Sequence, residues 1–374
     1  VAELSFFSAK HSMKGFRSMK KRVDSLNLVR VGLIFTIFLC HSGDMLPDVI
    51  GYYAGTLTGY ALQLFFMISG FCCLLSGYGK DLSTGPYMKK RWWKIFPMHF
   101  VGFLLMAFLI IYRAWAGGYD IDKSDFLAQA VVNLLFLQAW TPNEDFVYSF
   151  NGVSWFLSAL FFCYLLTPVM IRILKRFENY APWLLITVAF LQFGYALYFN
   201  HFIGTGSFCY TNVFPPYRFL EYLMGALLAV MYLKRRDGEG IPRSSMVQLV
   251  TVLLFFAVYV ITKHEMGFTR FFIVLELYLM YALCVYEGKV SDWGASKLMA
   301  SLADHIMPFY LVHSIVLKYM REFVLTGSSY TVEQPIIPWI ASLAIAIAFS
   351  YAYMAIDKRA RAAWQRRKQA KATA

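Results

Sequence analysis

The sequence predicts an all-α integral membrane protein with about ten transmembrane helices. Hydrophobic residues make up 59% of its 374 positions and aromatic residues 18%, which is more than the core of a soluble protein uses. Apolar runs long enough to cross roughly 30 Å of hydrocarbon recur from one end of the chain to the other. These runs lie at about residues 27–46, 57–78, 95–113, 152–173, 183–200, 216–233, 246–262, 268–286, 303–324 and 336–356.

Basic residues collect in every second connection between these runs. Most of the 35 lysines and arginines fall in six segments, and by the positive-inside rule such segments face the cytosol. Both ends of the chain are basic, so both termini are expected in the cytosol. The alternate connections carry Asp44, Asp120 and Glu144 with few basic residues, and we expect them outside. The six basic segments are residues 10–30, 80–94, 172–176, 234–243, 287–297 and 358–371.

One apolar stretch, FLAQAVVNLLFLQAW at residues 126–140, is too short to cross a bilayer upright. A full crossing needs roughly 20 residues. Counting this stretch as a span would also move Arg172, Lys175 and Arg176 to the outer side, against the charge rule. We therefore expect one re-entrant or interfacial helix on the outer face.

Short connections without a low-complexity linker predict one membrane domain at residues 27–356, between a basic cytosolic segment at 1–26 and a basic cytosolic tail at 357–374. The net charge of +13 is divided among connections that adjoin hydrophobic spans. Anionic membrane lipid is therefore the expected partner, and nucleic acid is not. The six cysteines lie in or beside apolar runs without metal-ligand spacing, so we expect neither a metal site nor disulfides.

Arg30 and His41 stand inside the first apolar run, where ionisable side chains are costly and usually functional. Eleven residues on a helix return to within about 20° of the starting direction and rise about 16 Å, so both side chains share one face. They predict a polar track with a fixed positive charge at its cytosolic end and a proton-exchanging group deeper in the bilayer. As alternatives, Arg30 could extend to the lipid headgroups, and His41 could cap its helix.

The stretch FFMISGF at residues 65–71 leads through a cytosolic turn into YMKKRWWKIFP at residues 87–97. Arg91 and Lys94 are three residues apart on a helix and therefore face the same way. Two cations at the cytosolic membrane edge suit a phosphorylated cosubstrate, and we assign them, with Ser69, to a cofactor site. The simpler interpretations are close helix packing at Ser69 and Gly70 and a basic cluster that only fixes topology.

Three polar or aromatic residues, Asn151, Trp155 and Ser158, cluster at the outer end of the fourth apolar run. A tryptophan ring beside hydroxyl and amide groups suits a sugar ring, so we assign these residues to substrate binding. Tryptophan at this depth is also ordinary anchoring at the membrane interface.

Three ionisable residues later in the chain complete the substrate-site prediction. Arg218 and Glu221 are three residues apart at the start of the sixth run, and His313 lies near the middle of the ninth run. Arg218 and Glu221 could equally form a structural ion pair. His313 could be a structural histidine bonded to a neighbouring helix.

Taken in this order, from Val29 to about Leu317, the motifs resemble the membrane acyltransferase family known as acyltransferase 3. The resemblance implies about ten helices and the transfer of an acyl group, usually acetyl from acetyl-CoA, to hydroxyls of surface glycans or other exported acceptors. It also implies the inner membrane of a bacterium. The matching motifs are Arg30-x10-His41, FFMISGF followed by Arg91-x-x-Lys94-Ile95-Phe96-Pro97, Arg218 with Glu221, and FYLVHS.

The sequence departs from the family pattern in three places. The commoner fourth-helix motif is Trp-Ser-Leu-Ser-x-Glu, whereas Phe156 and Leu160 stand here in place of the first Ser and the Glu. Lys94 replaces the usual Arg, and a lysine can supply charge to a phosphate but not a bidentate fork. His99 stands where an aromatic residue is common.

Acyl transfer from a thioester to an alcohol needs a base and a group that stabilises the oxyanion. His41 is the expected base, and Arg30 is the second expected catalytic group. With acetyl-CoA as donor, the phosphates would stay at the cytosolic edge near Arg91, Lys94 and Arg30, and the pantetheine arm would extend toward His41. A glycan or lipid-linked sugar would enter from outside. Direct transfer and a ping-pong route through acyl-His41 are both open.

A transporter or exporter of a glycan or small anion is the main alternative, because buried Arg, His and Glu are also typical of proton-coupled carriers. The sequence shows no pair of inverted halves with matched Gly/Pro-broken helices, which favours the enzyme. A scaffold that only recruits partners would not need buried ionisable residues.

Overall fold

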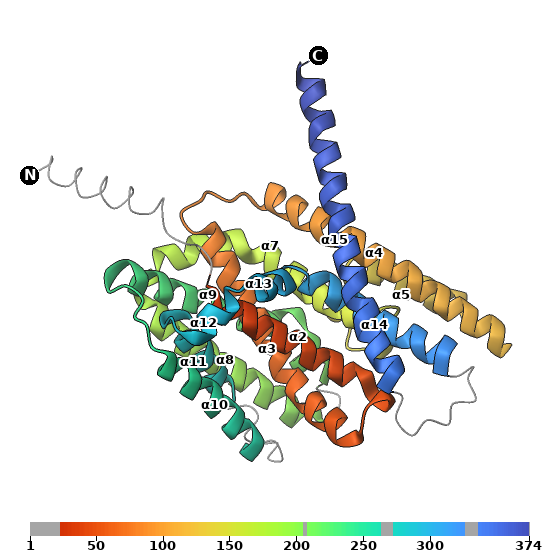
Figure 1. Cartoon of the computed structure of the whole chain (residues 1–374), viewed down its shortest axis with the longest axis horizontal. Helices are drawn as coiled ribbons and strands as arrows, with labels where there is room; N and C mark the ends of the chain where they lie inside the picture. The colour runs from red at the N-terminus through yellow and green to blue at the C-terminus, as the bar shows by residue number, and fades with distance from the viewer. Residues whose placement is uncertain (1–22, 205–207, 263–271, 326–335, 374) are drawn as a thin grey trace, which may run out of the picture.

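The computed structural model describes residues 23–204, 208–262, 272–325 and 336–373, and these ranges are built from helices joined by short connections (Figure 1). The basic segment predicted at residues 1–26 lies almost wholly outside the described residues. The helices follow the apolar runs closely, because a backbone in hydrocarbon must satisfy its own hydrogen bonds.

The α-helices of the described ranges are α2 (Ser25–Ser42), α3 (Asp48–Gly77), α4 (Thr84–Gly117), α5 (Lys123–Leu134), α6 (Glu144–Val147), α7 (Trp155–Arg176), α8 (Ala181–Phe202), α9 (Pro215–Gly238), α10 (Ser245–Thr262), α11 (Phe272–Val285), α12 (Lys289–Gly294), α13 (Lys297–Asp304), α14 (Ile306–Met320) and α15 (Ile336–Thr373). Short 3-10 turns η2 (Gln138–Trp140) and η3 (Gly152–Ser154) precede α7, and a π-helical turn, η8 (Arg321–Leu325), follows α14.

The predicted apolar runs fall on ten of these helices, but not all ten qualify as spans. Among the described residues, α2, α3, α4, α7, α8 and α15 are long and apolar enough to cross a membrane, and α13 with α14 would add a seventh span bent by 64°. α10 and α11 are shorter apolar helices, and α9 carries Arg218 and Glu221 in its first half. The chain is a multi-pass helical membrane protein, and the count of ten spans stays a prediction.

The short apolar stretch at residues 126–140 forms α5 followed by η2. At 12 residues, α5 is about 18 Å long, which is too short to cross the hydrocarbon layer. Asp122 caps its first turn by accepting from the backbone N–H groups of Ser124 and Asp125. The length of α5 therefore agrees with the expectation that this stretch is not an upright span.

Contacts between the connections define two ends of the bundle. At one end, Asn27 Nδ2 donates to the carbonyl of Gly294 at 2.9 Å, and Lys234 Nζ donates to Asn179 Oδ1 at 2.6 Å. We call this the basic end; α2 and α4 begin there, and α3, α7 and α9 end there. Its placement in the cytosol stays a prediction.

At the opposite end, two late segments of the chain contact the end of α2. Arg321 forms an ion pair with Asp44 at 2.8 Å, and the indole N–H of Trp339 donates to Ser42 Oγ at 2.8 Å. Both contacts join residues more than 270 positions apart in sequence. The first and last parts of the chain therefore pack together at this end.

The last helix, α15, continues without a break from the final apolar run into the basic tail, and its C-terminal part projects from the bundle (Figure 1). The tail predicted at residues 357–374 is thus helical as far as Thr373. The stretch KRARAAWQRRKQAK is rich in alanine, lysine, arginine and glutamine, which are strong helix formers. Arg361 and Asp357, one turn apart, form an ion pair at 2.6 Å.

Helices α3 and α9 cross with their backbones in direct contact. A Cβ atom built on Gly70 would lie 1.8 Å from the carbonyl oxygen of Tyr222, and one built on Gly225 would lie 1.8 Å from that of Met67. Such close approach is open only to residues without a side chain. The close helix packing considered for FFMISGF is therefore present at Gly70.

Gly70→Ala is expected to disrupt the bundle, because its methyl group would overlap a backbone atom that cannot rotate away. Overpacking of side chains alone costs about 1–3 kcal/mol, so we expect a loss of about 3 kcal/mol or more here. Thermal unfolding of the purified protein in detergent measures this loss. Gly59→Ala on the same helix is the matched control, because a Cβ there meets open space. Equal unfolding temperatures for the two variants would contradict the tight crossing.

Candidate functional site

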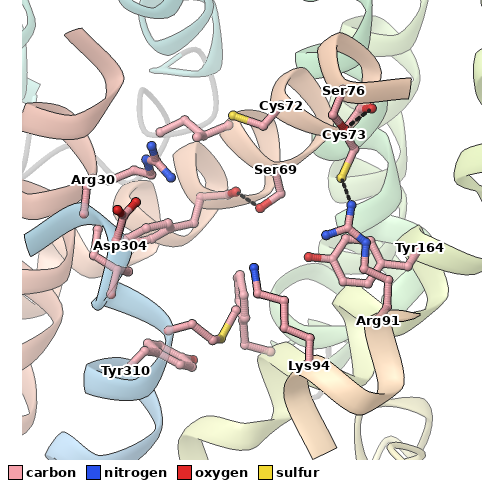
Figure 2. Close-up of a pocket in the computed structure, with 16 residues that line it drawn as sticks. Arg30, Ser69, Cys72, Cys73, Ser76, Arg91, Lys94, Tyr164, Asp304 and Tyr310 are labelled. Atoms are coloured by element: carbon pink, nitrogen blue, oxygen red, sulfur yellow. Dashed lines mark hydrogen bonds between the residues drawn. The ribbon is translucent and has the colours of Figure 1, made fainter. Parts of the chain in front are cut away.

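A cavity of about 390 Å³ opens among α2, α3, α4, α7 and the α13–α14 bend (Figure 2). We call it the central cavity. It brings together four residues that the sequence analysis selected from three separate motifs, namely Arg30, Ser69, Arg91 and Lys94. The remaining polar or sulfur-containing residues of its lining are Cys72, Cys73, Ser76, Tyr164, Asp304 and Tyr310, with Met307.

Arg91 is fixed in the wall of the central cavity by several contacts. One Nη atom lies 2.9 Å from Tyr87 Oη and 3.4 Å from Cys73 Sγ. The guanidinium also lies over the Tyr164 ring, 4.6 Å from its centroid, where a cation is attracted to the aromatic face. A guanidinium held in this way is preorganised to receive an anion.

Lys94 lies one turn along α4 from Arg91 and extends its ammonium group into the open part of the central cavity (Figure 2). The i, i+3 spacing puts both cations on one helix face, as the sequence predicted. α4 begins at Thr84, well before the predicted apolar run. The basic stretch is therefore part of the helix and not a flexible loop, so both side chains start from one rigid backbone.

Arg30 enters the central cavity from α2. Its Nη2 atom donates to Asn27 Oδ1 at 2.8 Å, and Asn27 in turn donates to the carbonyl of Gly294. Asn27 is completely buried. The anchor keeps Arg30 inside the bundle, so the alternative in which it extends to the lipid headgroups does not describe this structure. The lining contains three cations, Arg30, Arg91 and Lys94, and one carboxylate, Asp304. Its net charge is therefore positive, and the central cavity suits an anion.

The central cavity reaches from the basic end toward the middle of the bundle. On α3 its lining runs from Ser76 to Phe65, eleven residues or about 16 Å. Phe65, Phe156 and Tyr310 form its inner end, with the rings of Phe156 and Tyr310 5.3 Å apart. Ser69 donates to the carbonyl of Phe65 at 2.7 Å, so its oxygen is left to accept within the cavity.

His41 and His313 lie together beyond this inner end. Their ring centroids are 5.1 Å apart at an interplanar angle of 86°, and His313 is one turn along α14 from Tyr310. Nδ1 of His41 lies 2.9 Å from the Ile37 carbonyl, and Nδ1 of His313 lies 2.7 Å from the Tyr310 carbonyl. A carbonyl only accepts, so we assign the proton of each ring to Nδ1. Nε2 of each ring then carries the lone pair that a base needs.

The end of α2 that carries His41 is held by residues from the last third of the chain. Arg321 donates to the carbonyls of His41 at 3.1 Å and Ser42 at 2.5 Å, which satisfies carbonyls that the helix leaves free at its C-terminus. The indole N–H of Trp339 donates to the hydroxyl oxygen of Ser42. His41 therefore occupies a fixed position, in the last turn of its helix.

Arg218 and Glu221 form a buried ion pair. Arg218 Nη1 lies 2.8 Å from both carboxylate oxygens, and the two side chains are 2% and 0% exposed. Gln192 donates to the same carboxylate at 2.9 Å, and Trp155 lies 5.6 Å from the guanidinium. The predicted group of Trp155, Arg218 and Glu221 is thus brought together. Its role toward substrate stays a prediction.

Glu276 on α11 is a residue that the sequence analysis missed. It is fully buried, and neither of its carboxylate oxygens has a hydrogen-bond partner within the described part of the chain. It lies on α11, which packs against α9, the helix that carries Arg218 and Glu221. An isolated carboxylate is very costly to bury, so this group is expected to be a neutral acid. A single glutamate in an apolar run was the signal that could have found it.

Asn151 and Ser158 are both about 1% exposed and bond to backbone. Asn151 Nδ2 donates to the carbonyl of Leu311 at 2.8 Å, and Ser158 Oγ donates to that of Phe136 at 2.6 Å. Phe136 has a positive φ of 57°, which is rare for a bulky residue. The first contact joins the start of η3 to α14, and the second joins α7 to the segment before η2. The predicted substrate role of the two residues stays a prediction.

Three further cavity residues, Cys73, Tyr164 and Asp304, were not selected from the sequence. Cys73 and Tyr164 are ordinary members of apolar helices, and only the fold shows that both contact Arg91. Asp304 ends α13 directly before the bend into α14. Its place at the start of the apolar run at residues 303–324 was the signal that could have identified it.

Comparison with known proteins identifies the family. A family model described as an acyltransferase domain, Acyl_transf_3, matches residues 23–355. The chain belongs to the acyltransferase 3 family. This result confirms the resemblance found in the sequence motifs, and it makes the protein an acyltransferase whose acyl group is not an aminoacyl group.

Two relatives of this acyltransferase support the assignment. The acyltransferase MdmB of Streptomyces mycarofaciens is 27% identical over 322 residues, which cover 80% of each chain. An O-acetyl transferase of Shigella phage Sf6 is 25% identical over 254 residues, which cover 66% of this chain and 71% of the relative. No solved structure matches the chain.

The buried charges of this acyltransferase give a stability prediction. Arg218→Ala leaves Glu221 buried without its cation, and breaking a buried pair in this way costs about 3–5 kcal/mol. Glu276→Gln replaces a neutral acid by an amide of similar shape, so we expect a change within about 1 kcal/mol. Thermal unfolding in detergent measures both. If Arg218→Ala is no less stable than Glu276→Gln, Arg218 and Glu221 do not stabilise the fold.

Proposed function

We propose that this acyltransferase moves an acyl group, most simply acetyl, from acyl-CoA bound at the basic end to a hydroxyl of a glycan or other exported acceptor. The acceptor approaches from the opposite end of the bundle, and the membrane is the inner membrane of a bacterium. The observation that carries the proposal is the meeting of Arg30, Arg91 and Lys94 in one cavity that leads toward His41 and His313.

The charge and depth of the central cavity support a coenzyme A donor. Three cations at the basic end suit the phosphates of the cofactor, which are too polar to enter hydrocarbon. The lining becomes aromatic and apolar toward Phe65, Phe156 and Tyr310, as the pantetheine arm and acyl group require. Only the uncharged end of the donor therefore extends into the bundle.

His41 acts as the base in this proposal. Its Nε2 lone pair takes the proton of the acceptor hydroxyl while that oxygen attacks the thioester carbonyl. The tetrahedral intermediate then collapses, the carbon–sulfur bond breaks, and the proton passes from His41 to the leaving thiolate to give free coenzyme A. His313 contacts His41 and keeps its ring in the orientation that this proton transfer needs. Arg30 stabilises the negative charge of the donor phosphates where the central cavity opens.

The names of the relatives favour an enzyme over a transporter. The phage protein is described as an O-acetyl transferase, which agrees with acetyl as the group and a hydroxyl oxygen as the acceptor atom. A transporter needs no thioester donor, so the requirement for acetyl-CoA distinguishes the two activities.

The role of His41 as base is tested by measuring acetyl transfer with the purified protein in detergent. Radiolabelled acetyl-CoA and a glycan are added, and the release of the free thiol of coenzyme A is followed in parallel. His41→Ala is expected to lower the rate at least about a hundredfold, because general bases contribute factors of roughly 10²–10⁴. CoA binding should persist. His201→Ala is the matched control, because His201 is exposed on α8.

Two results would count against this assignment. Full activity of His41→Ala would remove His41 as the base, and acceptor movement without acetylation would point to transport. Label that remains on wild-type protein before acceptor is added, and is absent from His41→Ala, would instead identify the ping-pong route.

The test of the donor site is the KM for acetyl-CoA. Arg91→Gln and Lys94→Gln each remove a cation from the central cavity, and we expect KM to rise about tenfold or more because charged hydrogen bonds contribute roughly 1.5–3 kcal/mol. Lys89→Gln removes the same charge from an exposed position on the opposite side of α4 from Arg91 and should leave KM unchanged. Equal effects of Lys89→Gln and Lys94→Gln would show a general charge effect and no specific site.

A further inference from the structure

A second cavity of about 290 Å³ adjoins the central cavity between α4, α14 and α15. We call it the side cavity. The two cavities share three lining residues, Lys94, Asp304 and Met307, so they meet at the basic end of the bundle. A ligand that enters at this end can occupy both.

The side cavity has an apolar wall and a charged rim. Its charged residues are Lys94, Asp304, Asp357 and Arg361, and the last two come from the part of α15 where the predicted basic tail begins. Its remaining lining is apolar or aromatic, formed by Ile95, Met98, Met307, Pro308, Leu311, Tyr353 and Met354. The apolar wall suits the faces of a flat heterocycle, and the two cations of the rim, Lys94 and Arg361, can contact a phosphate while Asp357 pairs with Arg361.

Arg361 is oriented toward this rim by two hydrogen bonds. Its Nε atom donates to Asp357 at 2.6 Å, and one Nη atom donates to the carbonyl of Trp93 on α4 at 3.1 Å. Within the described residues these bonds use two of the five N–H groups of a guanidinium. The carboxylate and the carbonyl thus fix its plane, and an arginine fixed in this way suits a phosphate.

The position of the side cavity decides which part of a donor it fits. The acyl group must reach the inner end of the central cavity, near Tyr310 and the two histidines. The side cavity meets the central cavity at Lys94, Asp304 and Met307, and its apolar wall extends along α14 as far as Leu311. Its charged rim, with Asp357 and Arg361, lies at the basic end. The side cavity therefore lies where the nucleotide end of the cofactor remains, and an acyl chain would have to fold back to enter it.

We propose that the side cavity binds the adenosine 3′-phosphate end of the donor, with Arg361 of α15 contacting the 3′-phosphate. The inference rests on the proposed acyl-CoA donor and adds the place and the recognising residue of its nucleotide. α15 then contributes to the active protein through its basic part as well as through its span. The predicted lipid partner of the tail shares the same phosphate chemistry, so the test separates the two sources.

The test compares acetyl-CoA with acetyl-dephospho-CoA, which lacks only the 3′-phosphate. Wild-type protein is expected to prefer acetyl-CoA at least about tenfold in kcat/KM, and Arg361→Gln should bring this ratio close to one by raising the KM for acetyl-CoA with little change in kcat. Arg359→Gln is the matched control, because Arg359 is an exposed arginine on the same helix. It should keep the full preference.

Each other outcome has a distinct meaning. If wild type uses acetyl-CoA but Arg361→Gln keeps the full preference for it, this inference is wrong and the proposed function stands. If wild type neither binds nor uses acetyl-CoA while folded, the proposed function itself is wrong. If Arg361→Gln changes activity only in nanodiscs that contain anionic lipid, and not in phosphatidylcholine alone, Arg361 binds a lipid headgroup and the inference is overturned.

A cavity-filling variant provides an independent test. Met354→Trp places a large ring in the side cavity while it leaves Arg361 in place. We expect a higher KM for acetyl-CoA and an unchanged KM for acetyl-pantetheine, which has no nucleotide. An equal change for both donors would show that the side cavity does not hold the nucleotide.

Discussion

The backbone contact between α3 and α9 is the constraint on which the rest of the structure depends. Gly70 and Gly225 let the two helices touch without side chains between them. One face of α3 is thereby pressed against α9, and its neighbouring face, with Ser69 and Cys73, is turned into the central cavity. The same crossing keeps the first half of α9 inside the bundle, where Arg218 and Glu221 must pair because no water can solvate them.

Much of the fold and part of the site could be predicted from the sequence. Apolar runs located the helices because hydrocarbon leaves few alternatives to helical backbone. The spacing of Arg91 and Lys94 predicted a shared face, and the expected place of the donor phosphates at the cytosolic edge grouped Arg30 with them; all three line the central cavity. These predictions depend on local periodicity and on the family resemblance, and both can be recognised in a single sequence.

Other features depend on contacts between distant residues, which periodicity does not encode. Asn151 and Ser158 looked like donors for a sugar, yet each donates to a carbonyl from another segment, at Leu311 and Phe136. Glu276 was missed in its apolar run, and its burial beside the helix that carries Arg218 and Glu221 emerges only when α9 and α11 pack. The tail after residue 356 was read by its charge alone, whereas its helix carries Arg361 to α4.

The way the end of α2 is held has a consequence for biogenesis. His41 is made near the start of synthesis, but Arg321 and Trp339, which bond the last residues of its helix, are made near the end. A nascent or truncated chain that ends before α14 and α15 therefore contains His41 without the groups that hold the end of its helix. The position of this histidine is fixed only once the last part of the chain has been made and has packed against α2.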